Sequence, residues 1–195
     1  MTESENPCRV FFEQYAQHPK KVEILQRTGL AHEWECYSAS KHSPGPVQSN
    51  ERVLRLVINP IHIDPETGDL KPSAVTDVKD KGCSVERLSL TTIEESIATG
   101  RIVAAAKNEA NQGAPAREIH CVANLSVNDI RNIRVGANTQ AFCIFDTALE
   151  HNRAHADICQ VVSPKGQEAR SARSQLFALA DKSCIFQSYS GSDSN

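Results

Sequence analysis

The chain has 195 residues, of which 39% are hydrophobic, 23% are charged and only 5% are aromatic. This length suits one substantial globular domain. The formal charge is −3, with −4 on residues 1–100 and +1 on residues 101–195. Neither half therefore carries the basic excess that is typical of nucleic-acid-binding proteins. No apolar run approaches the roughly 20 residues that span a bilayer, and residues 1–10 lack the features of a secretory signal. We expect a cytoplasmic domain with no membrane partner.

The N-terminal part of the chain predicts a small helical region that precedes the main domain. Residues 9–17 suit a short helix, which His18-Pro19 ends because the residue before a proline resists the helical conformation. Residues 34–37 suit a short strand. The proline- and glycine-rich stretch around residues 41–50 is typical of a loop. We therefore expect an N-terminal helical appendage over residues 1–42, a main domain over residues 51–187, and a disordered tail over residues 188–195.

The main domain predicts strands and helices in irregular alternation. Apolar or alternating runs favour strands at residues 52–63, 83–88, 119–125, 141–145 and 155–162. Thr91 and Glu94 fit a capping box at the start of a helix that reaches residue 110. Ser126 starts a short helix, and Ser163-Pro164 starts one that ends near residue 180. This order predicts an α+β fold with a mixed or mostly antiparallel sheet and two or three packed helices. No Gly-x-Gly-x-x-Gly or P-loop run follows a strand, so no nucleotide-binding motif is present.

The chain has seven cysteines, an odd number, at wide spacing and without a Cys-x-x-Cys pair. This pattern favours buried reduced thiols over a disulfide scaffold or a zinc ribbon. Cys83 follows Gly82, and a thiol at such a turn can act as a nucleophile if a base lies nearby.

Two histidines and a carboxylate lie within seven residues, at His151, His155 and Asp157. On a helix, both imidazoles would face one side and could bind one metal ion. If a strand begins at residue 155 instead, His155 and Asp157 share a face and His151 belongs to the preceding loop. The second arrangement is favoured. These three residues, with His62 as a further ligand, are candidates for a site that holds a divalent metal, and His155 and Asp157 are also candidate catalytic residues.

Three segments of the chain together resemble a group of small bacterial proteins for which no activity is assigned. They are the turn that ends in Leu70-Lys71-Pro72-Ser73-Ala74, the run Cys83-Ser84-Val85-Glu86-Arg87, and Asn152-Arg153-Ala154-His155-Ala156-Asp157-Ile158. The likeness covers residues 51–180. The last motif usually reads Asn-Pro-Ala-His-Ala in that group, so Arg153 is a departure. The resemblance implies no catalytic role, but it singles out Arg87 and His155 as site residues.

Two functions remain open. Because no complete catalytic signature is present, the first is a non-enzymatic accessory or interaction subunit of a bacterial multi-protein system, of the defence or mobile-element kind, with another protein as its partner. The alternative is a small metal-dependent hydrolase or nuclease-like enzyme that uses His155 and Asp157. A convergence of His62, Arg87, His120 and His155 on one network would favour the enzyme.

Overall fold

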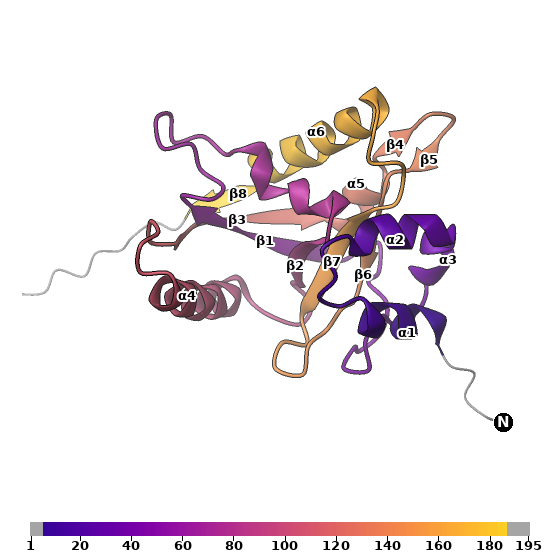
Figure 1. The fold of residues 1–195 in the computed structure, drawn as a ribbon, viewed down its shortest axis with the longest axis horizontal. Helices are drawn as coiled ribbons and strands as arrows, with labels where there is room; N and C mark the ends of the chain where they lie inside the picture. Colours follow the sequence, from indigo (N-terminus) through magenta and orange to yellow (C-terminus); the bar gives the residue numbers. More distant parts are fainter. Residues whose placement is uncertain (1–5, 187–195) are drawn as a thin grey trace, which may run out of the picture.

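A computed structural model describes residues 6–186 and has an antiparallel six-stranded sheet at its centre (Figure 1). The strand order is β6-β7-β2-β1-β3-β8. The strands are β1 (Arg52–Asn59), β2 (Cys83–Arg87), β3 (Glu118–Ser126), β6 (Phe142–Phe145), β7 (His155–Gln160) and β8 (Cys184–Phe186), and a separate hairpin is formed by β4 (Arg134–Val135) and β5 (Thr139–Gln140). The α+β prediction is confirmed. The predicted tail at residues 188–195 lies outside the described residues.

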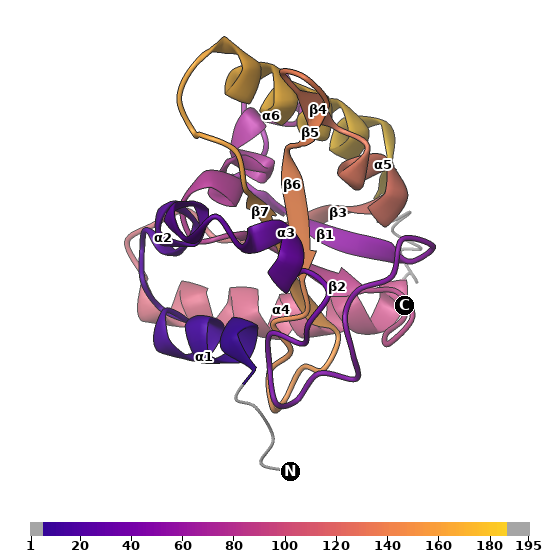
Figure 2. The same cartoon turned by 90° about the vertical axis from the view of Figure 1, so that its right-hand side faces the viewer.

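Helices cover both faces of the sheet (Figures 1 and 2). The helices are α1 (Pro7–Gln14), α2 (Lys21–Thr28), α3 (Ala31–Trp34), α4 (Ile93–Ala110), α5 (Val127–Arg131) and α6 (Gln167–Lys182), and two 3₁₀ turns span Pro72–Ala74 and Thr76–Lys79. The larger core lies under α5, α6 and the 3₁₀ turns, where Leu176 packs with Val53 and Ile158. On the opposite face, α4 covers β1 and β3 through Ile97, which packs with apolar residues of both strands.

The N-terminal helices cover the β6–β7 end of the face that also carries α4. Phe12, Leu25 and Trp34 pack there with Phe145 and Cys159. Figure 2 shows α1, α2 and α3 grouped at this end of the molecule. The predicted helical region is therefore packed against the main sheet through its own apolar cluster. The predicted strand at residues 34–37 is wrong, because Trp34 ends α3 and its indole lies against the ring of Phe11, with the ring centroids 5.5 Å apart.

Two predicted helix starts are displaced in the structure. The capping box of α4 is made by Thr92 and Glu95, one residue after the predicted pair, and Thr92 accepts from the backbone N–H of Glu95. The last helix begins at Gln167 after Gly166, and not at Ser163-Pro164. The backbone of Gly166 has a φ of 95°, which lies outside the helical region, so the helix begins only after this residue.

The prediction that all cysteines are reduced is wrong. Cys121 and Cys184 form a disulfide between the neighbouring strands β3 and β8, with their Cα atoms 5.9 Å apart. Their separation of 63 residues gives no paired-spacing signal in the sequence. The other five thiols are free, and all but Cys36 are buried. Within the described part of the chain, no helix is long and apolar enough to cross a membrane.

Candidate functional site

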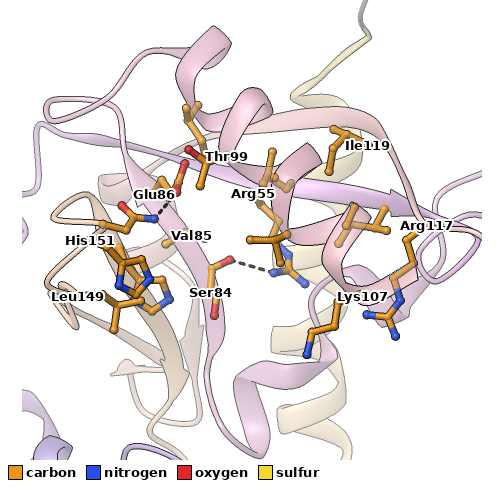
Figure 3. Close-up of a pocket in the computed structure, with 18 residues that line it drawn as sticks. Arg55, Ser84, Val85, Glu86, Thr99, Lys107, Arg117, Ile119, Leu149 and His151 are labelled. Atoms are coloured by element: carbon orange, nitrogen blue, oxygen red, sulfur yellow. Dashed lines mark hydrogen bonds between the residues drawn. The ribbon is translucent and has the colours of Figure 1, made fainter. Parts of the chain in front are cut away.

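A cavity of about 310 Å³ lies between α4, the strands β1 and β2, and the loop that precedes β7 (Figure 3). We call it the α4 pocket. Its floor is formed by β1 and β2, and one wall by α4 residues that include Thr99, Val103 and Lys107. The opposite wall comes from Leu149, His151, Asn152 and His155. Arg117, which directly precedes β3, also lines the pocket. The pocket therefore occupies the part of the sheet face that the N-terminal helices and α4 leave uncovered.

Strand register explains which side chains reach this pocket. Glu86 of β2 is paired with Leu54 of β1 on one side and with His155 of β7 on the other. Paired residues in antiparallel strands project from the same face. A carboxylate, an imidazole and an apolar side chain thus stand side by side across three strands on the floor of the pocket.

Glu86 has the least satisfied side chain in the pocket. It is only 9% exposed. Its Oε1 atom accepts a hydrogen bond from Nδ2 of Asn152, whereas its Oε2 atom is buried and has no hydrogen-bond partner among the described residues. A buried acceptor without a donor costs roughly 1–3 kcal/mol. A molecule in the α4 pocket, water included, can supply the missing donor.

His155 has one ring nitrogen that is hydrogen-bonded within the protein and one that has no partner among the described residues. Its Nδ1 atom lies 3.0 Å from both the carbonyl oxygen and the hydroxyl of Thr147. Because a carbonyl oxygen can only accept, Nδ1 carries the proton. No described residue hydrogen-bonds to the other ring nitrogen, Nε2. His155 is half-buried and lines the pocket, so Nε2 is available for a polar contact with a ligand.

Asp157 shares the face of His155, as the sequence predicts, but it is engaged elsewhere. Its carboxylate accepts from Nζ of Lys21 at 2.8 Å and from the hydroxyl of Ser84 at 3.3 Å. Burial acts to raise the pKa of the Asp157 carboxyl, but the charges of Lys21 and His155, together with hydrogen bonds from Lys21 and Thr147, hold that pKa below its ordinary value. The carboxylate joins α2 to β7 and is not directed toward a ligand.

The remaining candidates do not join His155 in one network. Arg87 donates two hydrogen bonds to the carboxylate of Glu51 and one to the carbonyl oxygen of Gly45, so it fixes a loop. His62 accepts from the backbone N–H of Ile58 at 3.0 Å, in the turn after β1. Burial, with the charges of Arg55 and Lys71, lowers the pKa of His62 to about 4. His120 lines a different cavity, next to the disulfide.

The four predicted metal ligands are likewise divided between different places. His151 and His155 both line the α4 pocket, whereas Asp157 is paired with Lys21 and His62 lies in its own turn. Among residues 6–186, no group of three or more His, Cys, Asp or Glu side chains could hold a metal ion. The candidate nucleophile Cys83 is buried on the opposite face of the sheet, and burial raises the pKa of its thiol. A raised pKa makes the reactive thiolate scarce.

Sequence reasoning missed Glu86, although one signal was present. Residues 83–88 were expected to form a strand, and Glu86 alternates in it with Val85 and Arg87. A strand in the middle of a sheet that is covered on both faces buries most of its side chains, and in β2 only Ser84 is exposed. A glutamate in such a strand needs a partner, and the sequence offers no obvious one.

No protein family, no curated protein and no solved structure matches this chain. The function must therefore be argued from the α4 pocket itself, and above all from Glu86.

Proposed function

We propose that the protein is a non-enzymatic binding protein that recognises a small organic ligand in the α4 pocket. The observation that carries this proposal is the Oε2 atom of Glu86, which is buried beside a cavity and has no partner in the described chain. The cavity is at the lower end of the size range of small-molecule sites. Binding sites of this kind combine apolar walls with a few polar groups that fix orientation.

The lining defines the chemistry of the ligand. Leu54, Leu56, Val103 and Ile119 give the pocket apolar surfaces, which suit an apolar body. The unpartnered Oε2 atom of Glu86 lacks a hydrogen-bond donor. A cationic donor forms a stronger hydrogen bond with a carboxylate than a neutral donor does. Nε2 of His155 offers a second polar contact. The ligand therefore has an apolar body and an amino or similar donor head.

The metal-dependent hydrolase that the sequence predicts as the alternative has no comparable support. It needs Asp157 beside His155 as a ligand or a base, and Lys21 neutralises that carboxylate at 2.8 Å. The partner protein that the sequence predicts stays a prediction, which a pulldown with the full chain tests.

Titration with octylamine tests the proposal, since this probe has an apolar body and a single cationic donor. Isothermal calorimetry and backbone amide shifts in NMR should show weak, saturable binding, with the largest shifts at residues of β2 and at the middle of α4. Val103→Trp places an indole at the pocket wall and should weaken binding by ~10-fold or more, which corresponds to ~1.4 kcal/mol.

Ile102→Trp is the matched control for this variant. Ile102 precedes Val103 on the same helix, is 72% exposed and does not line the pocket. Both substitutions add the same side chain to the surface of α4, so both should fold alike. The proposal is wrong if octylamine does not bind, or if the two variants weaken its binding equally.

A further inference from the structure

The α4 pocket has opposite charges at its two ends. Glu86 lies at one end, next to His151, and Lys107 and Arg117 lie at the other (Figure 3). The backbone N–H of Arg117 donates to Oδ1 of Asn108, and the carbonyl oxygen of Arg117 accepts from Nδ2 of Asn108. The carbonyl oxygen of Lys107 accepts from Nδ2 of Asn111. Neither cationic group forms an ion pair with a carboxylate of the described chain. Two cations at the pocket rim are thus available to an anionic group.

Resting on the proposed function, we infer that the ligand is bipolar, with a donor head at Glu86, an apolar body, and a carboxylate or phosphate at Lys107 and Arg117. The shared chemistry of the distal group is a compact anion. The buried, unpartnered Glu86 fixes the direction of the ligand, because a carboxylate repels the anionic end. The two basic side chains then lie where that end must emerge.

Strand geometry shows that the two charged ends lie a ligand's length apart. Along β1, Leu54 is the partner of Glu86, and Asn59 is the partner of Glu118, the residue that follows Arg117. Five residues of strand span ~17 Å at ~3.4 Å each. Helix α4 runs along this distance, with Thr99 and Lys107 eight residues apart, or ~12 Å along the helix axis. Both long basic side chains shorten the gap that the ligand has to bridge.

Apolar side chains occupy the space between the charged ends. Leu56 of β1 and Ile119 of β3 form the floor, and Val103 forms the wall one turn of α4 before Lys107. Gly100 makes this close packing possible, because a Cβ atom there would lie 2.6 Å from Cδ1 of Leu56. Arg55, which also lines the pocket, already donates to the carbonyl oxygens of Ala74 and Ser84. A polar group in the middle of the ligand would find few free partners there.

The test compares octylamine with 8-aminooctanoate, which has a carboxylate in place of the terminal methyl group, and with 8-aminooctyl phosphate. One of the two bipolar probes should bind about 1.4- to 5-fold more tightly than octylamine, the range expected for solvent-exposed ion pairs worth ~0.2–1 kcal/mol. Octanoate alone should bind more weakly than octylamine. A tighter aminooctanoate complex assigns the distal group as a carboxylate, and a tighter phosphate complex assigns it as a phosphate.

The double variant Lys107→Ala/Arg117→Ala should abolish this gain, so that the bipolar probes no longer bind more tightly than octylamine, whereas Lys182→Ala on the exposed surface of α6 should preserve it. Raising the salt concentration from ~0.1 M to ~1 M should also reduce the gain, since screening then acts within ~3 Å. If octylamine binds but neither bipolar probe binds more tightly, the bipolar ligand is excluded and the proposed function stands. If octylamine itself fails to bind, the proposed function fails first.

Discussion

Two buried carboxylates on one face of the sheet have opposite surroundings. Asp157 and Glu86 belong to the adjacent strands β7 and β2, where Asp157 pairs with Ser84 and Glu86 pairs with His155. Asp157 meets the ammonium group of Lys21 at 2.8 Å under the N-terminal helices. Glu86 borders the α4 pocket with one oxygen unpartnered. A buried charge with a built-in partner serves the fold, and the unpartnered oxygen of Glu86 is the observation that supports the proposed ligand.

The largest expected effect is at the paired carboxylate. Lys21→Ala leaves the charge of Asp157 buried without its counter-charge, which costs about 3–5 kcal/mol of folding free energy. Urea unfolding followed by circular dichroism measures this loss. Lys20→Ala is the control, because the side chain of Lys20 is 71% exposed and its ion pair with Glu23 is long, with 4.0 Å between Nζ and Oε2. This variant should change the stability by less than ~1 kcal/mol. Equal effects of the two variants would contradict a structural role for the Lys21–Asp157 pair.

The comparison also shows how far a sequence can locate a site. Local patterns predict that a strand starts at His155 and that His155 and Asp157 share its face, and the structure confirms both. They also predict that α4 continues past Gly100. These features depend on side-chain periodicity within a few residues.

The partners of the site residues depend instead on contacts between distant segments. Lys21 and Asp157 are 136 residues apart, and Asn152 and Glu86 are 66 residues apart. No local pattern in the sequence links such residues. The resemblance singled out Arg87 as a site residue, although it forms a buried ion pair with Glu51, and Glu86 beside it was overlooked. The type of a residue suggests its chemistry, but the fold decides whether a partner already uses it.

His62 is a third buried group, and it can accept its hydrogen bond from Ile58 only in its neutral form. A backbone N–H can only donate, so Nδ1 of His62 accepts from Ile58 without a proton of its own. The pKa of His62 is lowered from 6.5 to about 4, first by burial and then by Arg55 and Lys71. The unfolded chain therefore binds the proton first, and the stability that His62 contributes is lost as the pH falls from about 6.5 to about 4.

The variant His62→Asn isolates this contribution, since an asparagine oxygen can accept the same hydrogen bond without titrating. Between pH 6.5 and pH 4, the wild type should lose about 2 kcal/mol more stability than the variant. Asp146 acts in the opposite direction, because burial raises its pKa to about 6 and its contribution is lost as the pH rises. Asp146 is present in both proteins, so it cancels in the difference. Parallel stability curves for the two proteins would show that His62 does not titrate in this way.

The smallest stability effect is expected at Glu86, and its sign distinguishes this carboxylate from Asp157. Glu86→Gln keeps the acceptor that Asn152 uses and removes a buried charge that no described residue neutralises, so the free energy of unfolding should rise by about 1 kcal/mol. Octylamine should bind ~10-fold more weakly, because the charge-assisted hydrogen bond is lost. Glu109→Gln on the exposed surface of α4 should change neither quantity. A variant that is more stable and binds less ligand shows that Glu86 is retained for binding at the expense of the fold. If Glu86→Gln instead destabilises the protein as strongly as Lys21→Ala, Glu86 is a structural group like Asp157, and the case for a ligand in the α4 pocket is lost.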